Sequence, residues 1–184
     1  MLGSAAVQRV SVVGTSGSGK STLAVAMARV IGAPLLELDS VYHQPGWSLL
    51  AVEEFRRRVT AVADGERWVI DGSNRRALDI VWARADTVVW LDLPRRTVMR
   101  RVIWRTLRRV VGRVELWNGN REGWGQLLSW DKEESVIAWA WQTHYPRRQE
   151  FQAAMTDPAN GHLRFVRLTS PGAVRRFLLT LFTL

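Results

Sequence analysis

The sequence predicts an α/β domain of three layers, with helices on both faces of a parallel sheet. Short apolar runs alternate with longer helix-forming segments along the 184 residues, and this alternation is typical of βαβ units. The apolar runs lack a polar face, as expected for strands that helices cover on both sides. The length fits a single domain, residues 1–184, with a substantial core.

Apolar runs bounded by polar or turn residues are the expected strands. They cover residues 8–13, 35–38, 68–70, 87–91 and 165–168. Asp39, Asp71 and Asp92 directly follow the second, third and fourth of these runs. Because parallel strands present their carboxyl ends at one edge of the sheet, we expect these aspartates at that edge.

The segments between the strands carry helix start and stop signals. Gly32 ends the first helix, and Pro94 suits the first turn of the long arginine-rich helix. Pro146 is expected to interrupt a later helix. The predicted helices are residues 20–31, 52–63, 77–83, 94–111, 133–144 with a further helix to about 155, and 171–182.

Two remaining segments leave their roles open. Residues 112–125 are rich in glycine, asparagine and tryptophan, and we expect a loop that is the candidate mobile element. The last helix carries Phe177, Leu178, Leu179 and Phe182 on an apolar face. That face packs either on the core or on a second copy, so a monomer and a homodimer are both expected states.

The composition favours anionic partners. The chain has 26 basic and 17 acidic residues, a formal net charge of +9, and all but two of the basic residues are arginines. Such a surface suits nucleotides, nucleic acid or acidic lipid, although a genomic preference for arginine gives the same total. The absence of cysteine excludes disulfides and thiolate metal sites. No apolar run reaches about 20 residues, and the first residues do not resemble a signal peptide, so no membrane partner and a cytoplasmic location are expected.

The most specific motif is GTSGSGKST at residues 14–22. It matches G-x-x-x-x-G-K-[ST], with a predicted strand before it and a predicted helix after it, as a phosphate-binding loop requires. Glycines let successive backbone N–H groups point at phosphate oxygens, and the start of the helix adds its positive dipole end. A flexible Gly/Ser linker is the alternative, but a linker would not join a buried strand to a helix.

The motif therefore predicts ATP and Mg²⁺ as cofactors. The nucleotide-binding candidates are Gly14, Thr15, Ser16, Gly17, Ser18, Gly19, Lys20, Ser21 and Thr22. Within this set, Lys20 is expected to bridge the β- and γ-phosphates and Ser21 to bind Mg²⁺. Thr22 is expected near the α-phosphate.

The aspartates after the strands are the candidate acids of the site. Asp71 suits a magnesium contact, together with Ser21. Asp39 suits acceptance of the substrate hydroxyl proton, or binding of substrate or metal. Asp92 is a third candidate. For each of them, a helix cap or a turn is the alternative role.

The long basic helix supplies the candidate lid-side cations. It holds eight arginines and no acid between residues 95 and 113, namely Arg95, Arg96, Arg100, Arg101, Arg105, Arg108, Arg109 and Arg113. They suit a polyphosphate, and a solvated helix face is the alternative. The helix leads into the loop with Asn118, Asn120 and Arg121. A loop of this kind that closes over ATP would exclude water and stabilise the transferred phosphoryl group.

The ten tryptophans divide by their predicted positions. Trp68, Trp82 and Trp90 lie in or beside strands and are expected in the core. Trp47, Trp117 and Trp124 lie in predicted loops. Stacking on a base, covering the site and packing on helices are the alternative roles for them.

Taken together, these stretches resemble the adenylate-kinase-like P-loop kinases. The resemblance rests on the phosphate loop, LELD, WVIDGS, VVWLDLPRR and the arginine-rich helix. It is closer to a bacterial group described as DNA topology modulation or adenylate kinase-like proteins. Three stretches carry that closer likeness: L-D-x-x-Y-x-x-P-G-W at 38–47, WVIDGS at 68–73 and NGNRE at 118–122.

The resemblance implies a three-layer α/β/α kinase-like fold with a five-stranded sheet in the order 2-3-1-4-5. It also implies a substrate-side segment near residues 40–66 and a lid near residues 112–125. By position, Asp39 and Arg75 or Arg76 would face the acceptor. Arg105, Arg109 and Arg121 would be lid-side candidates. Adenylate kinases carry D-G-F-P-R where this chain has DGSNR at 71–75, which argues against AMP as the acceptor.

The favoured function is an ATP-dependent phosphotransferase acting on a nucleoside, a nucleotide or another hydroxyl compound. Its candidate catalytic residues are Lys20, Asp39, Arg105, Arg109 and Arg121. A nucleic-acid-associated ATP-binding protein is one alternative, which the positive charge favours, although the sequence lacks the usual nucleic-acid-binding motifs. A regulatory or toxin-like kinase is the other.

Overall fold

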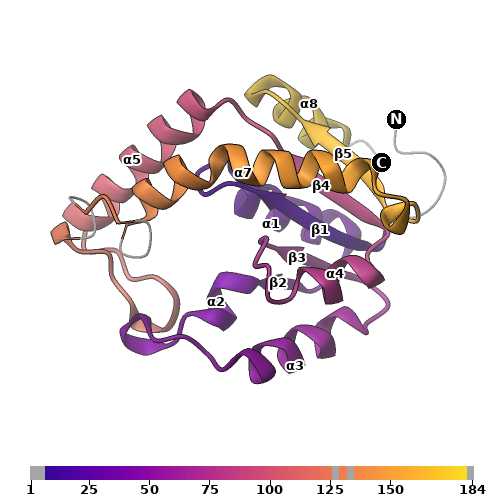
Figure 1. Cartoon of the computed structure of the whole chain (residues 1–184), viewed down its shortest axis with the longest axis horizontal. Coiled ribbons are helices and arrows are strands. Elements are labelled where there is room, and N and C mark those ends of the chain that lie inside the picture. Colours follow the sequence, from indigo (N-terminus) through magenta and orange to yellow (C-terminus); the bar gives the residue numbers. More distant parts are fainter. Residues whose placement is uncertain (1–6, 126–128, 132–134, 182–184) are drawn as a thin grey trace.

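The computed structural model describes residues 7–125, 129–131 and 135–181, and Figure 1 shows their arrangement. In these residues, five parallel strands form one sheet in the order β2-β3-β1-β4-β5. The strands are β1 (Arg9–Gly14), β2 (Leu35–Glu37), β3 (Trp68–Asp71), β4 (Thr87–Leu91) and β5 (Arg164–Leu168). The predicted fold class and strand order are confirmed.

Helices cover both faces of this sheet, as Figure 1 shows. The helices are α1 (Lys20–Ile31), α2 (Leu38–Tyr42), α3 (Val52–Ala63), α4 (Leu78–Arg84), α5 (Arg95–Val111), α7 (Val136–Thr156) and α8 (Pro171–Leu181). Short 3₁₀ turns are η1 (Pro45–Trp47), η2 (Trp117–Gly119) and η3 (Pro158–Asn160). Within the described ranges, no helix combines the length and apolar character needed to cross a bilayer.

One face of the sheet packs against α3, α4 and α7. Its buried cluster includes Trp68 of β3, Trp90 of β4, Phe55 of α3, Trp82 of α4 and Phe151 of α7. The Phe151 ring centroid lies 5.5 Å from that of Trp90 and 6.1 Å from that of Trp82. The three tryptophans expected in the core are therefore in it.

The opposite face of the sheet packs against α1 and α8. Val12 of β1 and Met27 of α1 are fully or almost fully buried there. Phe177 and Leu178 of α8 pack against the same cluster, whereas Leu179 is 60% exposed. The last helix thus contributes to the core, and Phe182 lies outside the described residues.

The second strand is one residue shorter than predicted. Glu37 pairs with Asp71 as the last register position, and Leu38 already begins α2. The Leu38 side chain is fully buried over Gly72, where an added Cβ would lie 3.1 Å from the Leu38 Cβ. Because Gly72 has no side chain, the chain can turn inward at Leu38. Asp39 therefore lies in the first turn of a helix and does not directly follow a strand.

The predicted break at Pro146 is wrong. One helix, α7, runs from Val136 to Thr156 with Pro146 inside it. Proline removes the N–H that would bond to the carbonyl of Gln142. Both residues lie on the exposed side of the helix, where water can satisfy that carbonyl. Packing of Phe151 and His144 on the other side then keeps the helix continuous.

Replacement of Pro146 by alanine is expected to stabilise the fold. The substitution restores an N–H donor and removes the ring that crowds the preceding turn, which outweighs the greater freedom of the unfolded chain by about 1–2 kcal/mol. Urea unfolding monitored by circular dichroism measures the change. Gln149→Ala, an exposed site on the same helix, is the control and should change stability by less than about 0.5 kcal/mol. A loss of stability in Pro146→Ala would contradict a continuous helix.

Candidate functional site

The glycine-rich loop between β1 and α1 has the backbone that a phosphate-binding loop needs. Gly14, Gly17 and Gly19 have φ values of 153°, 81° and 97°. Only glycine adopts such values without strain. The Ser18 N–H bonds to the Thr15 carbonyl at 3.0 Å, which closes the turn. The first turn of α1 contains no acidic residue, so nothing in that turn neutralises its positive end.

The loop also packs directly against α5. A Cβ at Gly17 would overlap Cγ2 of Val102 and lie 3.1 Å from the Val98 carbonyl oxygen. The Arg101 guanidinium donates a hydrogen bond to the Ser18 carbonyl at 3.1 Å. This contact of Arg101 was not predicted. It places the first half of the arginine-rich helix beside the loop.

Asp71 lies next to Lys20 and Ser21. Its side chain ends β3 and is buried, and its Oδ1 has no hydrogen-bond partner among the residues that the structure describes. Burial raises the pKa of Asp71, and the negative charges of Asp39 and Glu37 raise it further. The Lys20 ammonium and a hydrogen bond from Ser21 lower the pKa. A buried carboxylate oxygen without a partner, beside a hydroxyl, is a donor set that fits Mg²⁺.

Asp39 lies in the first turn of α2, within electrostatic range of other charged residues of the site. Its charge acts on Asp71 of β3, on Arg105 of α5 and on Arg147 of α7. Charged side chains from three elements that are distant in the sequence thus lie within electrostatic range of the Asp39 carboxylate. The acceptor-side role of Asp39 stays a prediction.

Arg147 is a site residue that sequence reasoning missed. Its guanidinium donates to the Ser73 carbonyl at 2.8 Å. Burial and the charge of Arg75 lower the pKa of Arg147, and Asp39 acts in the opposite direction. The only signal was the basic pair after Pro146. Because the helix was expected to stop there, its direction past that point could not be predicted.

The two arginines predicted for the acceptor side lie apart. Arg75 forms an ion pair with Glu150 of α7 and lies close enough to Arg147 to affect its pKa. The guanidinium carbon of Arg76 instead lies 5.3 Å from the centre of the Tyr42 ring. Arg75 is therefore the one of the pair that belongs with Arg147.

The three predicted lid-side arginines have different partners in the structure. Arg105 and Arg109 of α5 face Glu122, and Arg109 donates to Glu122 Oε1 at 3.1 Å. Arg121 donates to Glu115 at 3.4 Å, and both of these side chains are more than half exposed. The structure thus brings Arg105 within electrostatic range of Asp39 and Arg109 beside Arg105 and Glu122, whereas the Arg121 guanidinium pairs with Glu115 at the surface.

The loop of residues 112–125 is fastened to the segment after β2, as Figure 1 shows at the lower left. Asn120 is buried, accepts from the Trp47 N–H at 2.9 Å and donates to the Gln44 carbonyl at 2.9 Å. Asn118 donates to the carbonyls of Ser40 and His43 at 3.0 and 2.6 Å. We call these hydrogen bonds of Asn118 and Asn120 the clasp.

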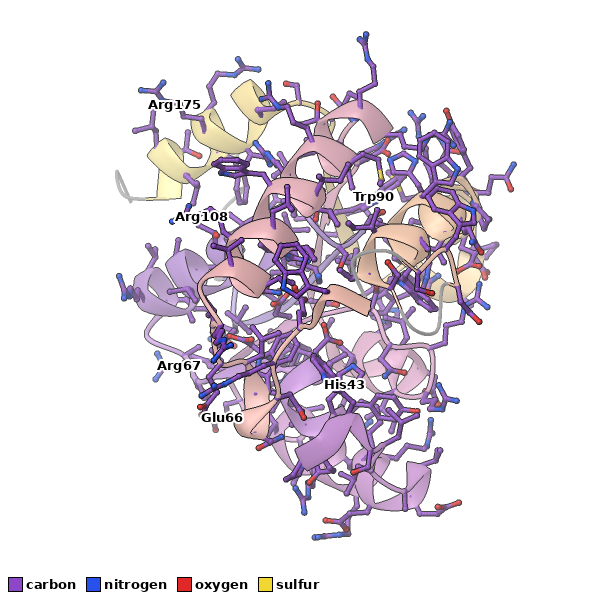
Figure 2. All side chains as sticks on the ribbon, turned by 90° about the vertical axis from the view of Figure 1, so that its left-hand side faces the viewer. His43, Glu66, Arg67, Trp90, Arg108 and Arg175 are labelled. Carbon is purple, nitrogen blue, oxygen red and sulfur yellow. The ribbon has the colours of Figure 1, made fainter. Side chains whose placement is uncertain are left out.

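Aromatic rings flank the clasp. The Trp117 ring stacks on His43 with 6.3 Å between centroids, and the Trp47 ring lies 5.6 Å from His43 at a steep angle. Figure 2 shows His43 low in the molecule, below Arg108 of α5. Trp47 and Trp117 thus pack on His43, in the segment after β2, whereas Trp124 is 58% exposed.

Asp92 has a structural environment. It is buried at the end of β4, accepts from Arg148 of α7 at 3.2 Å and accepts from the Nε of Arg167 of β5 at 2.9 Å. The Arg167 guanidinium also lies 4.7 Å from the centre of the Trp90 ring. These contacts tie α7 to the sheet and explain why an acid stands at this position.

Comparison with known proteins supports the fold. No family model matches the sequence, and no curated protein matches it. A shikimate kinase from Bacteroides thetaiotaomicron is 16% identical with a TM-score of 0.54, over 97% of this chain and 98% of that one. A shikimate kinase from Acinetobacter baumannii, in complex with shikimate, is 18% identical with a TM-score of 0.53, over 96% of this chain and 92% of that one. At these identities the likeness shows a common fold.

The contact between the loop and α5 can be tested with two glycines that share a positive φ. Gly17→Ala adds an overlap with Val102, whereas a Cβ at Gly19 meets only the end of the Arg101 side chain at 3.6 Å. Both substitutions strain the backbone. Gly17→Ala should lower the free energy of unfolding by about 1–3 kcal/mol more than Gly19→Ala does, because it also overpacks the interface. Urea unfolding measures the difference, and equal losses would argue against the packing described.

Proposed function

We propose that the protein transfers the γ-phosphoryl group of ATP to a hydroxyl group of a small acceptor, with Mg²⁺. The observation that carries this proposal is the proximity of the Lys20 loop, two carboxylates and partly buried arginines of α5 and α7 at one edge of the sheet. The solved structures with this fold include two named as shikimate kinases, which supports a small-molecule acceptor.

The nucleotide would bind along residues 14–22. Backbone N–H groups of the loop and the Lys20 ammonium would hold the phosphates, and Ser21 with Asp71 would hold Mg²⁺. When bound, the metal ion would neutralise part of the phosphate charge. Loop and lysine would therefore position the γ-phosphoryl group toward Asp39.

Asp39 would accept the proton of the attacking hydroxyl. Its charge acts on the buried Asp71 and on arginines of α5 and α7. A hydroxyl bound beside it would be directed at the γ-phosphorus. Arg147 and Arg75 are two cations on the acceptor side that repel each other. An acceptor that carries an anionic group as well as a hydroxyl would relieve that repulsion.

Arg105 and Arg109 would stabilise the charge on the transferred phosphoryl group. Burial and their mutual repulsion lower the pKa of Arg105, so an anion is favoured beside the pair. The clasp would keep water out of the site while the reaction proceeds. Catalysis is then positioning and charge neutralisation, as expected for phosphoryl transfer.

A nucleic-acid-associated role is the second candidate. The observation in its favour is the exposure of Arg100 and Arg108 on α5. Nucleic-acid binding through these arginines would fall steeply with salt, whereas small-molecule turnover would not. The closer resemblance to the DNA topology modulation group, a cytoplasmic location, the toxin-like alternative and the oligomeric state stay predictions.

The first test is turnover with a panel of nucleosides, nucleotides, sugars and hydroxy acids, measured as ADP formation. Acceptor-dependent ADP release is expected, and Lys20→Ala should reduce it by at least about 10²–10³-fold because the phosphates lose their cation. Arg175→Gln is the control, since Figure 2 shows Arg175 on α8 well away from His43. ATP binding without stimulation by any acceptor would count against the small-molecule kinase.

Arg147 tests the anionic group of the acceptor. Arg147→Gln should raise the KM of the best acceptor by about 10–100-fold, because a charge-assisted hydrogen bond is lost, and should leave the KM of ATP within about twofold. Arg175→Gln again serves as the control. A rise in the KM of ATP with an unchanged acceptor KM would move Arg147 to the nucleotide side.

A further inference from the structure

Glu122 is a buried acid in the loop that follows α5. Its side chain is 8% exposed, and its Oε1 accepts the hydrogen bond from Arg109. Its Oε2 is buried with no hydrogen-bond partner within the described part of the chain. Burying a carboxylate costs free energy, which opposite charges placed close to it offset.

The two arginines that face Glu122 repel each other. Arg105 and Arg109 are four residues apart on α5, so they lie on the same side of the helix. Burial and the Arg109 charge lower the pKa of Arg105, and Glu122 and Asp39 act against that effect. The Arg105 Nε is itself buried and unpaired among the described residues. Glu122 is therefore the negative charge that lets both guanidinium groups lie inward together.

The clasp fixes the position of Glu122. Asn120, two residues earlier, is bonded at both ends of its amide to the backbone of residues 44 and 47. The carbonyl of Arg121 accepts from the Trp47 indole at 3.3 Å. The two residues before Glu122 are thus anchored to residues 44 and 47. From this fixed position the Glu122 carboxylate contacts Arg109 of α5.

We propose that Glu122 is a positioning residue that aims Arg105 and Arg109 at the γ-phosphate. It acts through these arginines and does not itself touch the nucleotide. The inference rests on the proposed function and adds a specific consequence. An arginine pair aimed at the γ-phosphate should make the protein prefer ATP over ADP, and that preference should depend on Glu122.

The experiment compares the affinities of a non-hydrolysable ATP analogue and of ADP, each with Mg²⁺, by calorimetry. The proteins are the wild type, Glu122→Gln, Arg109→Gln and the double variant. Glu122→Gln should lower the preference for the ATP analogue by about tenfold, because the guanidinium groups lose the carboxylate that orients them. The double variant should lower it no further than Arg109→Gln alone, since both changes remove the same interaction.

Glu115→Gln is the matched control. Glu115 lies in the same loop and also pairs with an arginine, but its side chain is 60% exposed. It should keep the wild-type preference for the ATP analogue. Glu122→Asp, which keeps the charge on a shorter side chain, should recover part of the preference lost in Glu122→Gln.

The outcomes separate the two proposals. An equal loss of affinity for both nucleotides in Glu122→Gln indicates a role in loop stability alone and overturns the positioning role. Tighter binding of the ATP analogue indicates that Glu122 competes with phosphate, and it also overturns that role. A wild-type protein that binds neither nucleotide overturns the proposed function as well. None of these readouts requires the acceptor to be known.

Discussion

The parallel register of β1 between β3 and β4 is the constraint on which the site depends. Val12 pairs with Asp71, and Gly14 pairs with Leu91, so β1 and its two neighbours end at the same edge. The chain after β1 must then turn over that edge, where the glycines allow it to curl toward α1. Because the Gly72 N–H bonds to the Val12 carbonyl at 3.0 Å, Asp71 is held beside the start of the loop. The pairing of β1 with β3 thus determines where Lys20 lies relative to the Asp71 carboxylate.

The partly buried arginines at this edge need negative charge beside them. Burial lowers the pKa values of Arg105 and Arg147, although Asp39 acts against this for both. Arginines remain charged in proteins, so the energetic cost of burying them must be offset by negative partners. A bound polyphosphate and an anionic acceptor would provide that compensation. The inward arginines therefore say more about function than the net charge of +9 does.

Local sequence signals predicted the parts of the fold that local physics decides. The helices α1 and α3 and the strand β4 were predicted to the residue, because glycine, aspartate and apolar patterning mark their ends. The course of the chain past Pro146 was not predictable, since it depends on burial of Phe151 and on the exposure of the proline. Arg147 was missed for the same reason. On α5, the apolar Ile103 is 40% exposed, because α7 packs on Val98 and Val102 instead.

The clasp shows why motif spacing alone could not complete the site. Asn118 and Asn120 were recognised only as residues of a candidate lid, and nothing in their spacing indicates which backbone they bind. In the structure their amides donate to the backbone carbonyls of Ser40 and Gln44, shortly after Asp39. The loop that follows α5 and the segment after β2 therefore form one connected unit. A nucleotide held by the loop of residues 14–22 and an acceptor held beside Asp39 would then be enclosed by the same unit. Since Arg109 is bonded to Glu122 of that unit, the same contacts that hold the loop also hold the Arg109 side chain.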